Sequence, residues 1–283
     1  MSAKKRVRRT LTFEKTDRVP IDYAANPVIN KRLMDALGLR SQEALLTALG
    51  VDFRVMEVSY TGPQLFPAVP GHTVDPEYGF VSRWVPNQYG GYQDFCRFPL
   101  QDAEEALIDA WPFPDPDAYD YENLSRQVKR YEGKALYIGS PGYPDIINSL
   151  GRVMGMEDCL VNLQLRDAAT LRFIRRKANF ELAKLERMLH AIRKAGSEAD
   201  FLMLGEDLGT QLGPMIHQEL FDDIFRPVFA RYINLAEAHQ LPVMVHSCGS
   251  SSWVFERFIK MGIRAVDALQ PEAADMSPAY LAA

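Results

Sequence analysis

A histidine and a cysteine two positions apart have the clearest chemical potential in this sequence. His246 and Cys248 follow the apolar run 241–245, and Gly249 comes directly after them. A short, β-branched run that stops at a glycine is typical of a buried strand. Side chains alternate between faces along a strand, so His246 and Cys248 should point the same way. Imidazole and thiolate are two of the ligands that zinc prefers.

The pair alone supplies only part of a metal site, because zinc sites normally take three or four protein ligands. Taken by itself, such a spacing more often reflects a hydrogen-bonded histidine beside a buried thiol. The interpretation therefore depends on what the other predicted strands bring to the same place.

A carboxylate pair follows the preceding predicted strand, 201–204. Glu206 and Asp207 stand between Gly205 and Gly209. Neighbouring residues on a strand point to opposite sides, so we expect one of the two to face the pocket. That carboxylate would bind a metal, position a substrate or move a proton. The alternative is that both are loop carboxylates that cap the helix beyond.

Three further polar residues are candidates for substrate contact because they lie at the ends of predicted strands or just after them. Asp22 ends a predicted first strand, 18–22, which has Pro20 at its edge. Tyr143 lies in the loop 139–144, and Gln270 follows the last predicted strand, 265–269. Residues in such places meet at one edge of a parallel sheet, where active sites of α/β proteins lie.

Strand and helix patterns alternate regularly after residue 121. Strands are predicted at 135–139, 201–204, 241–245 and 265–269, with helices between them, of which 167–195 is the longest and 217–239 is interrupted near Pro227. Strands that alternate with helices favour a parallel sheet. The chain has no dinucleotide-binding fingerprint. The sequence therefore predicts an α/β protein with a (β/α)8 TIM barrel.

The first 120 residues are less regular. Helices are predicted at 31–37 and 41–49 and a strand at 51–58, while 60–98 is rich in glycine, proline and aromatic residues. Alternating runs around Gly90 and Gly91 predict a β-hairpin there, which we interpret as an insertion or lid. Only six or seven barrel strands can be counted. Either an early strand is hidden in the aromatic segment, or the barrel is incomplete at its C-terminal end.

Composition narrows the class of protein. The chain has 283 residues, 47% of them hydrophobic, and a formal net charge of −5. This predicts one domain over 1–283 and gives no sign of nucleic-acid binding. The basic cluster 4–9 is best explained as the solvated face of a first helix. Three widely spaced cysteines, no long apolar run and no secretory signal lead us to expect a cytoplasmic protein outside the membrane.

Several segments, in order along the chain, resemble the uroporphyrinogen decarboxylase superfamily. They are the opening Arg9–Pro20, the Gly-Glu-Asp-Leu-Gly-Thr-Gln segment 205–211, the His-Ser-Cys-Gly segment 246–249, and Asp267 with Gln270 and Pro271. The His-x-Cys-Gly motif, together with the acidic strand end, is most similar to the branch of cobamide-dependent methyltransferases. The resemblance implies a (β/α)8 barrel of the uroporphyrinogen decarboxylase type.

The resemblance also implies an activity. It predicts a zinc-dependent methyltransferase that moves a methyl group between a corrinoid protein and a small thiol, folate or aryl-ether substrate. One zinc ion would bind His246 and Cys248, and methylcobamide would be presented by the partner corrinoid protein. Glu206 or Asp207 would act in catalysis or supply a third ligand. That branch completes its zinc site with a distal cysteine, for which this sequence has no counterpart.

Two alternatives stay open at this point. One is a metal-free decarboxylase of tetrapyrrole biosynthesis, although the segment 21–27 lacks the arginines that grip substrate carboxylates in the true decarboxylases. The other is a truncated, non-catalytic barrel. An open barrel exposes two sheet edges, which a second copy could cover in a homodimer.

Overall fold

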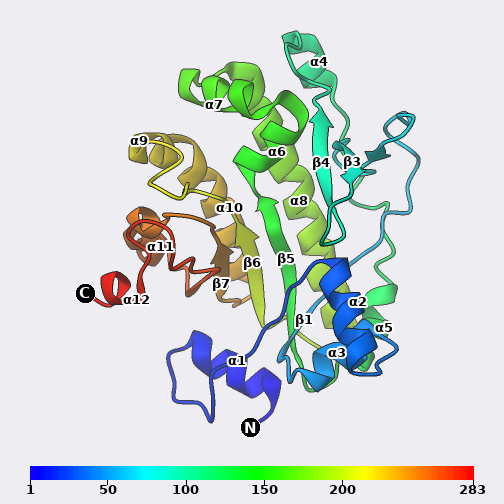
Figure 1. Cartoon of the computed structure of the whole chain (residues 1–283), viewed down its shortest axis with the longest axis vertical. Helices are drawn as coiled ribbons and strands as arrows, with labels where there is room; N and C mark the ends of the chain where they lie inside the picture. Colours follow the sequence, from blue (N-terminus) through cyan, green and yellow to red (C-terminus); the bar gives the residue numbers. More distant parts are fainter.

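A five-stranded parallel sheet forms the centre of the computed structural model, which describes residues 1–283 (Figure 1). Every neighbouring pair in this sheet is parallel. The carboxyl ends of the strands therefore lie at one edge, as the alternation of helices and strands predicted. In their order across the sheet, the strands are β1 (Phe53–Val55), β5 (Ala135–Pro144), β6 (Phe201–Gly205), β7 (Val243–His246) and β8 (Ala265–Asp267).

The two faces of the sheet are buried by different parts of the chain. Alternate residues such as Leu202, Leu204 and Val245 belong to the main core, which they share with the helices. The intervening residues, such as Phe201 and Met203, pack against the N-terminal helix α1 (Ala3–Leu11) in a second, smaller core. The pleat thus separates two faces of the sheet. One face packs against the helices of the main core, and the other is covered by α1 at the amino ends of the strands. His246 falls on the second face, in line with Met244.

Helices connect the strands after β5. The long helix predicted at 167–195 is present, and the interruption predicted near Pro227 is a π-helical turn just before it. No helix is both long and apolar enough to span a bilayer. The helices in this part are α6 (Ile146–Met154), α7 (Met156–Leu165), α8 (Ala168–Lys194), α9 (Gln218–Leu220), the π-turn η1 (Phe221–Phe225), α10 (Arg226–Ala238), the 3-10 turn η2 (Ser252–Val254), α11 (Phe255–Lys260) and α12 (Pro278–Leu281).

The predicted hairpin is also present. β3 (Val81–Val85) and β4 (Tyr92–Arg97) pair antiparallel around Gly90 and Gly91, and β2 (Thr73–Val74) adds a third strand. We refer to residues 60–98 as the lid. In Figure 1 the lid lies to one side of the parallel sheet, next to α6. The remaining helices are α2 (Pro27–Ala36), α3 (Gln42–Ala48), α4 (Glu105–Ala110) and α5 (Asn123–Arg130).

The parallel sheet is open, so the closed eight-stranded barrel that we predicted is not seen. β1 and β8 each pair with a single neighbour. The aromatic segment does not hide a further barrel strand, because its strands pair among themselves. The strand predicted at 18–22 was also wrong: Ile21 exchanges hydrogen bonds with the backbone and side chain of Asp52 rather than forming a ladder.

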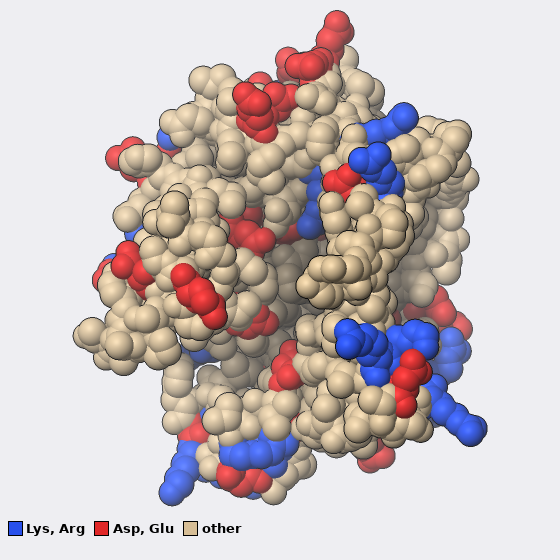
Figure 2. Space-filling model, in the orientation of Figure 1, with Lys and Arg blue, Asp and Glu red and all other residues tan.

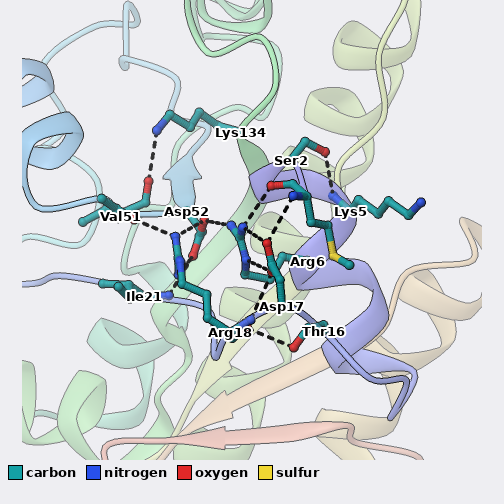
Figure 3. Close-up of polar contacts among 12 residues, drawn as sticks. Ser2, Lys5, Arg6, Thr16, Asp17, Arg18, Ile21, Val51, Asp52 and Lys134 are labelled. Atoms are coloured by element: carbon teal, nitrogen blue, oxygen red, sulfur yellow. Dashed lines mark hydrogen bonds and ion pairs between the residues drawn. The ribbon is translucent and has the colours of Figure 1, made fainter.

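The basic cluster at 4–9 is on a helix, as predicted, but it is not simply a solvated face. Arg6 is buried and forms ion pairs with Asp17 and Asp52, which Figure 3 shows between α1 and the start of β1. Arg18 joins the same network through Asp52. This network, together with Val7 of α1, fixes the N-terminal helix beneath the sheet.

Candidate metal centre

Three side chains that can bind metals meet at the carboxyl edge of the parallel sheet. One ligand atom from each of Asp207, His246 and Cys248 lies within 4.8 Å of the other two. Strand register explains the meeting, because Gly205 pairs with His246 and Asp207 follows two residues after Gly205. All three residues are half-buried, so the cluster is reachable from solvent. Figure 2 shows that this face of the molecule is hollowed along its middle, with carboxylates among the side chains that border the hollow.

The ligand atoms face one another. The Nε2 atom of His246 lies 3.3 Å from the Sγ atom of Cys248 and 3.7 Å from Oδ1 of Asp207. The backbone N–H of Cys248 donates to the same Asp207 oxygen at 3.0 Å. The pairing of His246 with Cys248 that strand alternation predicted is therefore present. The structure adds Asp207 to the pair.

A second carboxylate orients the histidine from behind. Asp267, at the end of β8, lies opposite His246 in register, and its Oδ1 is 2.7 Å from Nδ1 of His246. This hydrogen bond raises the pKa of His246 above its ordinary value, while burial acts in the opposite direction. It also leaves Nε2 directed at Asp207 and Cys248. A carboxylate behind a histidine is the usual outer partner of a metal-bound imidazole.

The thiol of Cys248 is protonated in the metal-free protein at neutral pH. Burial, followed by the negative charge of Asp207, raises the pKa of Cys248 to about 11. A bound divalent cation reverses this balance, because it deprotonates a coordinating thiol. With the thiol deprotonated in this way, the cluster would offer a bound cation two negative groups and an imidazole.

Asp207 is held in place from α6. The side-chain amide of Asn148 donates to Oδ2 of Asp207 at 3.0 Å and to Asp145 at 2.9 Å. Asp145 is itself buried, in a left-handed conformation with φ 43°, immediately before α6. Sequence reasoning missed Asn148 and Asp145. Sequence reasoning named Asp267 only within the motif resemblance, because the predicted strand ran to residue 269, whereas β8 ends at Asp267.

Glu206 points away from the cluster. Its side chain is buried and accepts hydrogen bonds from the backbone N–H groups of Ile146 and Ile147, at 2.6 and 2.9 Å. Burial, followed by the charge of Asp145, raises the pKa of Glu206 well above its ordinary range. The two neighbouring carboxylates thus face opposite sides, as the pleat predicted. Asp207 faces the cluster, and Glu206 satisfies the first N–H groups of α6.

The other three predicted site residues are placed differently. Gln270 accepts a hydrogen bond from the N–H of Gly249 at 3.0 Å, so it supports the loop that carries Cys248. Asp22 lies in an exposed loop before α2. Partial desolvation of its carboxyl group, followed by the charge of Asp267, raises the pKa of Asp22. Tyr143 lines a separate cavity under the lid. Their roles in substrate binding stay predictions.

Comparisons with known proteins complete this description. No family model matches the sequence, and no curated protein matches it significantly. Among solved structures, the chain is similar in fold to a methyltransferase from Methanosarcina mazei, with a TM-score of 0.58 and 12% sequence identity. The likeness covers 95% of this chain and 76% of that one. At this identity, the similarity establishes a shared α/β fold.

Proposed function

We propose that this protein is a zinc-dependent methyltransferase that moves a methyl group between a corrinoid protein and a small thiol, folate or aryl-ether substrate. The observation that carries the proposal is the cluster of Asp207, His246 and Cys248 at the carboxyl edge of the sheet, with Asp267 behind His246. The structural neighbour, which is named a methyltransferase, and the motif resemblance support the same class of reaction.

The donor set fits zinc. Carboxylate, imidazole and thiolate are all ligands of this ion, and catalytic zinc sites use three protein ligands and keep a fourth position open for water or substrate. Asp207 would take the place of the distal cysteine that the resemblance led us to expect. Asn148 and Asp267 would provide the outer hydrogen bonds that hold such ligands in place.

The chain's own residues prepare this site for an acceptor thiol. When bound, zinc would lower the pKa of the acceptor's thiol and keep it as thiolate near neutral pH. Asp267 fixes the ring of His246, and Asn148 fixes the carboxylate of Asp207, so neither has to reorganise. The acceptor thiol would lose its proton to solvent on binding zinc. The resulting thiolate would form a bond to the methyl carbon of methylcobamide as the cobalt–carbon bond breaks, with that electron pair left on cobalt.

Metal content of the purified protein tests this proposal. We expect one zinc ion per chain, and a loss of most of that zinc in His246→Ala and Asp207→Ala. Cys96→Ala is the matched control, because Cys96 is a half-buried cysteine on the lid, away from the cluster. A metal-free wild-type protein that decarboxylates uroporphyrinogen would contradict the proposal and favour the alternative function.

Replacing Asp267 with asparagine should weaken zinc binding without removing a ligand. The amide keeps the size of the side chain but loses the negative charge that accepts from Nδ1 of His246. Loss of an outer-shell carboxylate typically lowers metal affinity by about 10- to 100-fold. Competition with a chromophoric chelator would measure the change. Unchanged affinity would mean that Asp267 does not orient His246 toward the metal.

A further inference from the structure

A second cavity, of about 500 Å³, lies between the lid and the carboxyl end of β5. Its walls include Ser82, Gln93 and Phe95 from the lid, and Ser149 and Arg152 from α6. Asp207, His246 and Cys248 do not line it. The cavity and the candidate metal centre nevertheless lie at the same edge of the sheet, because Arg152 pairs with Asp145, whose neighbour Asn148 holds Asp207.

Arg152 enters this cavity with its hydrogen-bonding capacity unused. Its guanidinium lies 5.0 Å from the ring centre of Phe95 and 5.4 Å from that of Phe80. The nearest carboxylate oxygen, on Asp145, is 3.5 Å away, and the side chain donates no hydrogen bond within the chain. A guanidinium has five N–H donors in a planar fork that matches a carboxylate. The rings orient this fork without occupying its donors.

Two buried hydroxyls add to the unused polar groups. Ser82 and Ser149 are only 7% and 3% exposed, and neither side chain has a hydrogen-bond partner in the chain. Neither hydroxyl oxygen is fully enclosed by protein atoms, so both keep access to the cavity that they line. Buried polar groups without partners are costly unless water or a ligand satisfies them.

Unlike Arg152, which forms only the ion pair with Asp145, the other charged groups of the cavity wall form hydrogen bonds within the chain. Asp75 accepts from the backbone N–H groups of Glu77 and Tyr78, at 3.0 and 2.7 Å. Glu77 accepts from Lys184 at 2.7 Å and from the hydroxyl of Tyr119 at 2.6 Å. Arg152 is thus the charged side chain of the wall whose donors remain for a ligand.

We propose that this cavity binds a small carboxylic acid with a flat, apolar body. The carboxylate would accept two hydrogen bonds from Arg152 and further ones from the hydroxyls of Ser82 and Ser149. The apolar body would lie against Phe95 and Tyr143, which line the same space. Pockets that combine aromatic walls with a few convergent polar groups are typical of small-molecule sites. The proposal does not depend on a metal at Asp207.

Benzoate is the probe for this site, and benzamide is its neutral counterpart of the same shape. Calorimetric titration should show saturable benzoate binding, with or without a metal chelator, and at least about tenfold weaker binding of benzamide, because a hydrogen-bonded charge is lost. Arg152→Gln should weaken benzoate by a similar factor. Arg97→Gln should leave benzoate binding unchanged, because Arg97 is an exposed residue of β4 that lies outside the cavity.

Ser149→Ala provides a second test if Arg152→Gln loosens the lid. It removes one hydrogen bond from a hydroxyl to the carboxylate and should weaken benzoate binding by about fivefold, while benzamide binding, which lacks the charge, should change less. Equal affinity for benzoate and benzamide, or an equal loss in Arg152→Gln and Arg97→Gln, would overturn the proposal. So would the absence of any saturable benzoate binding to the folded wild-type protein.

Discussion

Cys248→Ala is expected to lower the rate of methyl transfer from methylcobalamin to a small thiol by about 100-fold or more, since Lewis-acid stabilisation of this kind contributes several kcal/mol. The substitution removes one of the three proposed metal ligands, and the two that remain, on Asp207 and His246, would form only half of a tetrahedral shell. Its direct effect on folding should be small, because Cys248 is only half-buried. The rate can be followed anaerobically from the absorbance of the cobalamin.

The pH profile separates loss of the metal from a general loss of structure. Under the proposed mechanism, zinc holds the acceptor thiol as thiolate in the wild-type protein, so the rate should change little between about pH 6.5 and 8.5, the range below the ordinary pKa of a free thiol. In Cys248→Ala the residual rate should rise tenfold per pH unit over that range, as the free thiol ionises. Cys159→Ala, at a buried cysteine of α7, should keep the flat profile. A flat profile in both variants would argue against metal activation of the thiol.

Strand alternation correctly predicted that His246 and Cys248 lie side by side, because this placement depends only on local geometry. His246 and Cys248 are two residues apart at a strand end, so a single pleat places them side by side. The same rule separates Glu206 from Asp207, although it could not say which of the two would face the cluster. The choice depends on α6, whose first N–H groups bind Glu206, and that contact joins residues about 60 positions apart in the chain.

Which segments join the sheet, and whether the sheet closes into a barrel, could not be predicted in the same way. Each strand from β6 to β8 follows a helix and pairs with the strand before it, so periodicity is sufficient to order them. The N-terminal part has no such rule. Residues 18–22 look like a strand, but Pro20 cannot donate to a ladder, and the carboxylate of Asp52 takes the N–H of Ile21 instead. A long-range side-chain contact of this kind leaves no periodic signal in the sequence.

The contact between Asp52 and Ile21 belongs to the ion-pair network of Figure 3. Asp52→Asn should lower the free energy of unfolding by about 3 kcal/mol, which is typical when one partner of a buried ion pair is removed. Asp52 is 2% exposed and accepts hydrogen bonds from Arg6 at 2.6 Å and from Arg18 at 2.7 Å. Asparagine keeps the shape but leaves the buried Arg6 with Asp17 as its only counter-ion. Urea unfolding would measure the loss.

Asp35→Asn is the matched control for this substitution. Its ion pair with Lys31 joins two side chains that are 65% and 73% exposed, and such surface pairs contribute about 0.5 kcal/mol or less. An equally small effect of Asp52→Asn would mean that the network in Figure 3 does not hold α1 against the sheet.

The pH dependence of the stability loss in Asp52→Asn tests whether the charge of Asp52 is its cause. Burial acts to raise the pKa of Asp52, but hydrogen bonds from Arg18 and Ile21 and the charges of the two arginines outweigh it, so the pKa is lowered. A carboxyl with a lowered pKa in the folded state stabilises it above the unfolded pKa of about 3.9, and this contribution is lost as the pH falls through the folded value. The difference in unfolding free energy between the wild type and Asp52→Asn should therefore be constant near neutral pH and shrink below about pH 4. A difference that stayed the same in acid would assign the effect to the shape of the side chain rather than to its charge.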